Sequence, residues 1–71
     1  GDFMIWMLVV IILNLEVSPI QVQHGEILET FHSNQDCQKR HTEFFDTAKA
    51  EGQRIPDNFN LGCIVIAMQH V

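Results

Sequence analysis

The sequence predicts a small α+β domain with the element order β-β-α-β, a three-stranded sheet in the order 2-1-3, and one helix on one face of that sheet. Three observations support this fold class: an uninterrupted apolar run over residues 3–13, a second apolar run over residues 61–68, and helical periodicity between residues 34 and 51. The chain of 71 residues is sufficient for one domain, spanning residues 1–71. A core this small is commonly supplemented by a disulfide or by association with another chain.

The run over residues 3–13 contains no charge, glycine or proline, and we expect it to form the first strand. It lacks an alternation of apolar and polar residues, which indicates that both faces of this strand are covered, as in the centre of a sheet. The residues that favour a strand are Phe3, Ile5, Trp6, Val9, Val10, Ile11 and Ile12, which are β-branched or aromatic.

The same run has an alternative interpretation as a membrane anchor over residues 3–15, with a disulfide-bonded domain outside the bilayer. A helix of eleven residues spans about 16 Å, against about 30 Å of hydrocarbon. As a leader peptide, the run lacks a basic segment before it and a small-residue cleavage site after it. We therefore expect the central strand and keep the anchor as the alternative.

Residues 14–23 are expected to connect the first strand to a second strand over residues 24–31, because a Ser-Pro pair within them is typical of a turn. In the second strand Ile27 and Phe31 are predicted to point to one side. Glu29, between them, is interpreted as the kind of charge that discourages further pairing at an edge strand.

Residues 34–51 are predicted to form a helix that starts after the N-cap Ser33 and stops at Gly52. Asp36, three residues after the serine, resembles the acidic member of a capping box. The apolar stripe of this helix has offsets of 0, 4, 7, 8 and 11 residues and consists of Cys37, His41, Phe44, Phe45 and Ala48.

After a loop over residues 52–60, residues 61–68 are expected to form the third strand. A right-handed crossover through the helix would make the second and third strands parallel. With the third strand beside the first, the sheet order is 2-1-3 and the first strand is central. One helix can cover one face of this sheet, and an uncovered apolar face typically marks an interface with a second copy, another protein or lipid. The candidate interface residues are Phe3, Trp6, Leu8, Val10 and Ile12.

The two cysteines, Cys37 and Cys63, fall on elements that are expected to pack against each other. In one interpretation they form a disulfide that closes a loop of roughly 25 residues and contributes about 3 kcal/mol. In the other they are buried free thiols, which behave as small apolar core residues. The redox state of the compartment decides between the two.

A metal site or a reactive thiol is a further hypothesis for these cysteines. Candidate metal ligands are Cys37, His41, Cys63 and His32, because positions four apart share one face of a helix. No C-x2-C or H-x3-H motif supports the site, and a disulfide would consume two of its ligands. Catalysis has little support, since Glu26 and Glu29 are expected on opposite faces of their strand and no phosphate-binding glycine loop is present. We therefore expect no enzyme activity and no cofactor.

The charge distribution argues against nucleic acid as a partner. The formal net charge is −5, and residues 1–38 contain no lysine or arginine. Phosphate recognition needs clustered basic residues, whereas the only adjacent pair is Lys39-Arg40.

Several short motifs occur in a recognisable order: Trp6-Met-Leu-Val-Val, Glu29-Thr-Phe-His-Ser33, Cys37, and Cys63-Ile-Val. Together they resemble uncharacterised small proteins of tailed phages and bacteria that have a leading tryptophan strand, an F-x-S-x-x-x-C helix start and a closing C-V/I strand. The resemblance implies a disulfide-bearing β-β-α-β domain and carries no catalytic residue. The chain departs from this pattern in its long connection over residues 14–23 and in its continuation to His70-Val71.

These observations predict a non-enzymatic structural or interaction protein, an accessory or virion-associated component of a phage or bacterium. Its expected partner is protein, either a second copy or a larger assembly, with a membrane as the alternative and no nucleic acid. The expected location is extracytoplasmic or on a virion if the disulfide forms. A metal or thiol-redox module is the second alternative.

Overall fold

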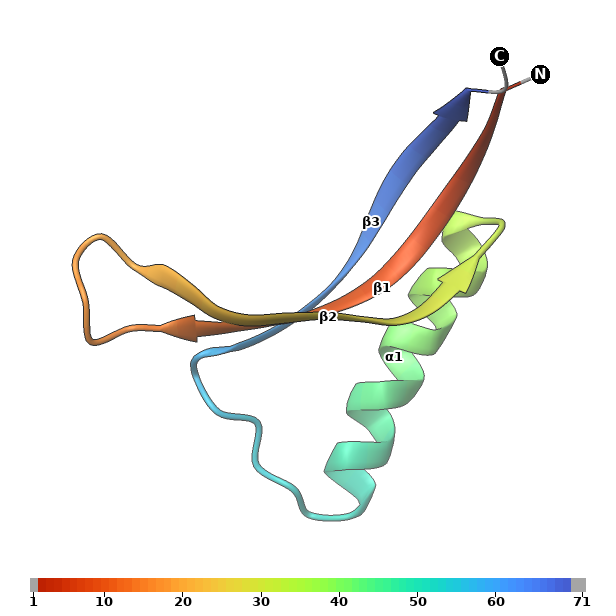
Figure 1. Ribbon diagram of the computed structural model, residues 1–71. Coiled ribbons are helices and arrows are strands. Elements are labelled where there is room, and N and C mark those ends of the chain that lie inside the picture. Colours follow the sequence, from red (N-terminus) through yellow and green to blue (C-terminus); the bar gives the residue numbers. More distant parts are fainter. Residues whose placement is uncertain (1, 70–71) are drawn as a thin grey trace.

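The computed structural model describes residues 2–69, and the side chains of residues 4–67. It contains β1 (Asp2–Asn14), β2 (Gln21–Phe31), α1 (Asn34–Ala50) and β3 (Phe59–Gln69) (Figure 1). The strands form one sheet in the order β2-β1-β3, and β1 is antiparallel to both neighbours. β2 and β3 are therefore parallel to each other. This arrangement confirms the predicted α+β fold class and the predicted strand order.

β1 is the central strand, and its two neighbours overlap only over part of its length. β3 pairs with β1 from Asp2 to Ile12, whereas β2 pairs with it from Trp6 to Asn14. The sheet is three-stranded only over Trp6–Ile12 and continues at each end as a two-stranded ribbon. Figure 1 shows these ribbons diverging, with β1 and β2 extending to the left and β1 and β3 toward the upper right.

The strands are longer than the sequence predicts. β2 begins at Gln21 rather than at residue 24, because the hairpin continues through the pairs of Leu13 with Val22 and Asn14 with Gln21. The prediction placed Gln21 and Gln23 in the connection over residues 14–23 because they are polar. They fit the strand because both faces of the ribbon are exposed to water there. β3 likewise begins at Phe59, two residues earlier than expected.

Both ends of α1 have the predicted signals. At the start, the backbone N–H of Asp36 donates to Ser33 Oγ at 3.2 Å. At the end, Gly52 has a φ of 71°, a conformation that favours glycine. The N–H of Gly52 donates to Lys49 O at 3.1 Å and that of Gln53 to Ala48 O at 2.8 Å, which is the Schellman pattern of helix termination.

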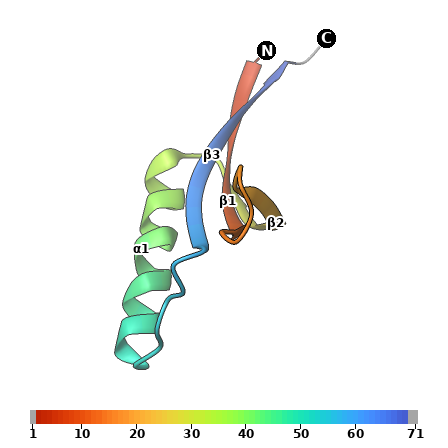
Figure 2. The same ribbon diagram turned by 90° about the vertical axis from the view of Figure 1, so that its left-hand side faces the viewer.

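The helix covers one face of the sheet, and its inner side makes the core. Leu8 is 2% exposed and Val10 is 8% exposed, and the helix buries Cys37 and Ala48 opposite them. Because successive side chains of a strand point to opposite faces, the even-numbered residues of β1 face α1 and the odd-numbered residues face away. In Figure 2 the helix stands on one side of the strands, and among residues 2–69 no element lies on the other side.

An aromatic cluster fixes the second half of α1 against the start of β3. The rings of Phe44 and Phe59 stack with centroids 5.7 Å apart and an interplanar angle of 6°. Phe45 meets Phe59 edge-on at 6.4 Å, and His41 lies 5.1 Å from Phe45. These contacts extend the core beyond the sheet centre and explain why the stripe residues of the helix are aromatic there.

A β-bulge in β2 changes which side chains share a face. Leu8 pairs with Glu29 and Val9 pairs with Ile27, so Leu28 is the extra residue between the two pairs. Glu26 pairs with Val10, and it therefore lies on the helix side together with Glu29. The expectation that these two glutamates lie on opposite faces was wrong, as was the expectation that Ile27 shares a face with Phe31. Both assumed strict alternation, which the bulge interrupts.

We predict that Gly52→Ala lowers the free energy of unfolding by about 1 kcal/mol, because a Cβ is unfavourable in the left-handed region. Urea denaturation at a fixed protein concentration measures this. Gly52→Asn is the matched control and should lose less, since asparagine tolerates this conformation better. Equal stability of wild type and Gly52→Ala would show that the glycine is not needed to end the helix.

Candidate functional site

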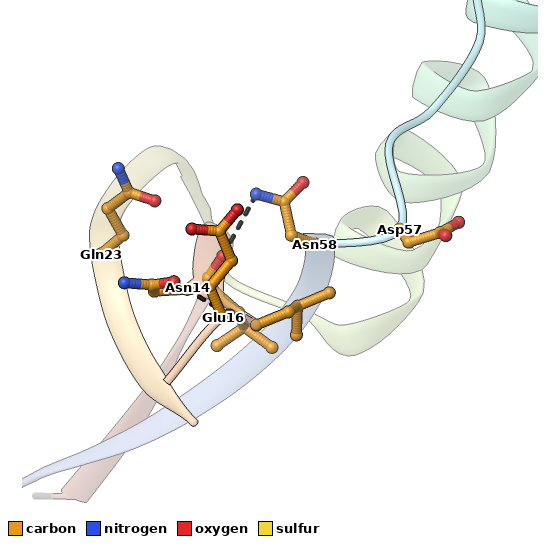
Figure 3. A pocket seen from close by; sticks show the side chains of 7 residues that line it. Asn14, Glu16, Gln23, Asp57 and Asn58 are labelled. Atoms are coloured by element: carbon orange, nitrogen blue, oxygen red, sulfur yellow. Dashed lines mark hydrogen bonds between the residues drawn. The ribbon is translucent and has the colours of Figure 1, made fainter. Parts of the chain in front are cut away.

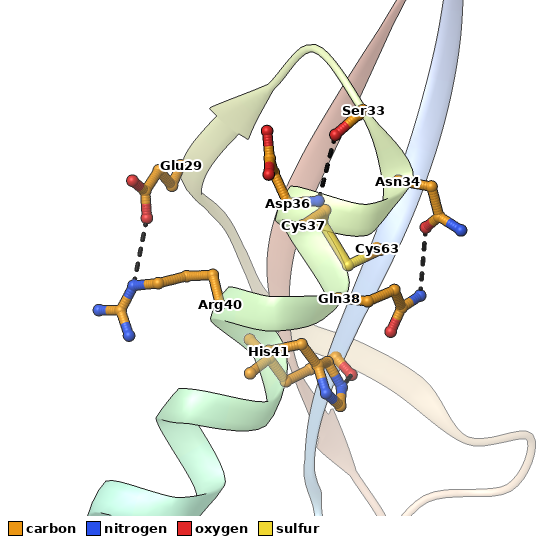
Figure 4. Close-up of a disulfide and its surroundings, with 10 residues drawn as sticks. Glu29, Ser33, Asn34, Asp36, Cys37, Gln38, Arg40, His41 and Cys63 are labelled. Carbon is orange, nitrogen blue, oxygen red and sulfur yellow. Dashed lines mark hydrogen bonds and ion pairs between the residues drawn. A yellow bond between two sulfur atoms is a disulfide. The ribbon is translucent and has the colours of Figure 1, made fainter.

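The two cysteines form a disulfide beneath the first turn of the helix. Cys37 and Cys63 are bonded with their Cα atoms 6.1 Å apart, as Figure 4 shows. Cys37 is fully buried, and Cys63 lies beside Leu8 in the neighbouring strand. The sequence allowed either a disulfide or two free thiols, and the structure contains the disulfide. It attaches α1 covalently to the sheet over the middle of β1.

The predicted metal ligands are not assembled into a site. Cys37 and Cys63 are bonded to each other, and Nε2 of His41 donates a hydrogen bond to Leu61 O at 2.9 Å. His32 is exposed beside the N-cap. In the part of the chain that the structure describes, no three histidine, cysteine or acidic side chains lie close enough together to hold a metal ion. The disulfide also removes the thiolate that a cysteine nucleophile requires.

A polar hollow of 470 Å³ lies beside the end of β1, between the β1–β2 turn and the loop before β3 (Figure 3). Two of its three amide side chains hold the backbone: Asn14 Oδ1 accepts from the N–H of Glu16 at 3.0 Å, and Asn58 Nδ2 donates to Leu13 O at 3.1 Å. These bonds join the turn and the loop to the strand. The hollow is lined by Leu13, Asn14, Leu15, Glu16, Gln23, Asp57 and Asn58.

No helix or strand among residues 2–69 covers the sheet face opposite α1, which we call the open face. Four of its residues on the outer strands are well exposed: Ile27 at 55%, Leu28 at 45%, Ile64 at 44% and Ile66 at 42%. Register and alternation place the odd-numbered residues of β1 between them, half-buried by their neighbours. The apolar side chains of the open face are Ile5, Met7, Val9, Ile11, Leu13, Val22, Ile27, Leu28, Ile64 and Ile66.

The open face carries no charged side chain among residues 4–67. The titratable residues of β2 all pair with even-numbered residues of β1 and so lie on the helix side: His24, Glu26 and Glu29. There Glu29 forms an ion pair with Arg40 of the helix at 3.3 Å (Figure 4), and Glu26 lies 3.6 Å from His24. Among residues 4–67, the charged side chains of the sheet therefore lie on its covered side, around the core, while its open side is apolar.

Most of the predicted interface residues lie on the side of β1 that faces the helix, rather than on the open face. Leu8 and Val10 are buried under α1, and Trp6 and Ile12 share their side of β1 by alternation. The side chain of Phe3 lies outside the described part of the structure. The run over residues 3–13 has no polar residue to show which side meets the helix. The side that meets the helix follows from the register of β1 and β3. Leu8 pairs with Cys63, which places the disulfide on the even-numbered side of β1.

The chain as a whole exposes more surface than a folded monomer of its mass. Its accessible surface is 5567 Å², whereas the size relation for monomeric proteins gives about 4,500 Å² at 8.2 kDa. Its radius of gyration is 14.6 Å, against about 11 Å for a compact domain of 71 residues. The excess of about 1,000 Å² agrees with a sheet that has one face uncovered by the helix and that continues at each end as an open two-stranded ribbon.

Compared with models of protein families, with characterised proteins and with solved structures, the chain matches none of them. The resemblance to small phage and bacterial proteins therefore stays a prediction. The membrane alternative requires a helical anchor over residues 3–15, whereas residues 3–14 lie in the central strand. Within residues 2–69, no helix has the length and apolar character needed to cross a bilayer.

We predict that the Cys37→Ala/Cys63→Ala variant loses about 3 kcal/mol of stability, because the disulfide closes a loop with a sequence separation of 26. Urea denaturation at a fixed protein concentration measures the loss, and wild type unfolded in reductant is the control. Intact mass measured after unfolding should rise by two hydrogens on reduction. An unchanged mass would contradict the disulfide.

Proposed function

We propose that this chain is a non-enzymatic interaction domain that places its open face against another protein in a larger assembly. The observation that supports this most directly is the open face itself, which is apolar and carries no charged side chain among residues 4–67. Monomeric proteins rarely leave large contiguous apolar patches uncovered, and such patches mark interaction sites.

Protein fits this face better than nucleic acid does. Nucleic acids are bound by clustered lysine and arginine side chains, and the four basic residues of this chain lie on α1 and in the loop that follows it. The open face offers phosphate groups no positive charge. A protein surface with exposed apolar side chains is the complementary partner.

Protein also fits this face better than a lipid surface does. Proteins that rest on membranes place lysine and arginine around the apolar surface and often add tryptophan at the interface. The single tryptophan, Trp6, lies on the helix side of β1, and the chain has a net charge of −5. Anionic lipid headgroups would repel this charge.

The disulfide supports a location outside the reducing cytosol. Disulfides persist in secreted and periplasmic proteins and on the surface of virions. The proposal is therefore an extracytoplasmic or virion-associated accessory component of a phage or bacterium, in agreement with the resemblance of its motifs. The absence of a free thiol among the described residues supports a role that depends on contact rather than on reaction.

The proposal predicts that replacing two exposed isoleucines of the open face, in the variant Ile27→Lys/Ile66→Lys, removes the adhesive character of the surface. Wild-type protein at micromolar concentration should either bind the neutral apolar dye Nile red or be associated, as judged by sedimentation velocity. The variant should do neither, because two desolvated charges oppose any contact with this face.

The matched control is Thr42→Lys/Gln53→Lys, which adds the same charge at exposed positions of α1 and the loop after it. It should behave as wild type in both measurements, and circular dichroism should show that both variants remain folded. A wild-type chain that is monomeric and leaves the dye unbound would contradict the proposed function.

A further inference from the structure

We infer that the occupant of the open face is a second copy of this chain, and that the two sheets pack face to face with both helices on the outside. This inference rests on the proposed function and specifies its partner. The resulting dimer has four layers in the order helix, sheet, sheet, helix. Two sheets packed in this way lie about 10 Å apart.

The accessible surface of the whole chain is large enough to allow a dimer interface of ordinary size. A stable protein interface of standard size removes about 800 Å² from each partner. The accessible surface of the chain exceeds the value for its mass by about 1,000 Å². One face-to-face contact would therefore reduce the accessible surface area of each copy to about the value of a folded monomer of the same mass.

The charge distribution permits two copies of an acidic chain to meet on this face and on few others. Each copy carries a net charge of −5, so contacts that bring acidic surfaces together are unfavourable. The open face has no charge among residues 4–67, and the glutamates of β2 point to the helix side. In the dimer they lie on the outer sides of the two sheets, separated by roughly a Debye length. Depletion of charge is typical of the buried centre of homodimer interfaces.

The shape of the open face is suited to packing against the same face of a second copy. Val9, at its centre, has Ile27 beside it on β2 and Gly62 beside it on β3, while Ile11 has Gly25 beside it on β2. A Cβ placed on either glycine would meet nothing within 4 Å, so each glycine leaves a hollow next to an isoleucine or a valine. A two-fold interface brings a surface against itself and therefore needs projections and hollows on the same patch.

The edges of the sheet are less suited to joining two copies. The edge strand β2 contains two register shifts and two glutamates, features that oppose pairing with another strand. The other edge of the sheet is β3. Asn58 O accepts from the N–H of Leu13, and because backbone groups alternate in direction along a strand, the carbonyl of Leu61 points away from β1. There it accepts a hydrogen bond from His41. Part of the β3 edge is thus occupied by the helix.

Sedimentation equilibrium on the full chain at micromolar concentration tests the inference. We expect a mass of 16.4 kDa, twice the chain mass of 8.2 kDa. The Ile27→Lys/Ile66→Lys variant should dissociate at least about 100-fold more readily, because its four new charges meet across the interface. The control Thr42→Lys/Gln53→Lys should keep the dissociation constant of wild type.

The outcomes separate this inference from the proposed function. A wild-type monomer that binds Nile red through the open face would overturn the dimer and leave a docking face for a different protein. A wild-type monomer that leaves the dye unbound would overturn both. A dimer that survives the lysine substitutions unchanged would show that the two copies meet elsewhere, and would overturn the face-to-face arrangement.

Discussion

The attachment of α1 to β1 through the Cys37–Cys63 disulfide and Leu8 is the contact on which the remaining architecture depends. Leu8 and Cys37 are the largest fully buried side chains among the described residues, and Leu8 pairs with Cys63, the other half of the disulfide. The aromatic cluster around Phe59 holds the other half of the helix. Two attachments along its length fix the direction of the helix across the strands, and no element among residues 2–69 covers the remaining face of the sheet.

Helix length explains why the core is so small. A helix of 17 residues is about 25 Å long, whereas a strand of 13 residues extends about 43 Å. The helix therefore covers only the middle of β1, where all three strands are paired. Beyond it the two ribbons are open on both sides, which is why Met4 and Val65 are exposed although they share the side of Leu8. The chain thus has more strand than one helix can bury.

Much of this fold could be predicted from local sequence, because its signals are short-range. Ser33 and Gly52 set the helix ends through their own hydrogen bonds and backbone angles, and the uninterrupted apolar run of β1 indicates that it is the central strand. The side of β1 that faces the helix could not be predicted in this way. Residues 3–13 are apolar at every position, so the choice depends on long-range register, above all on the pairing of Leu8 with Cys63.

The bulge in β2 was missed for a different reason. The segment Glu26-Ile-Leu-Glu29 places two glutamates three residues apart, which under strict alternation sends one of them to the apolar side. That conflict is a signal of an extra residue, and the expectation of opposite faces disregarded it. The identification of the open face depended on the same detail, since Ile27 lies on that face only because the register shifts between it and Glu29.

The extra residue at Leu28 also sets how this strand can change by insertion or deletion. With it, both glutamates lie on the side that holds Arg40, and two large apolar residues lie on the other. Deleting Leu28 would remove the bulge but leave Ile27 opposite Val9 and Glu29 opposite Leu8, so both glutamates would stay on the helix side. Pairing the unchanged sequence without the bulge would instead rotate one half of β2 by 180° and send one glutamate to the apolar side. The separation of charged and apolar side chains between the two faces of β2 thus depends on one irregularity in its pairing with β1.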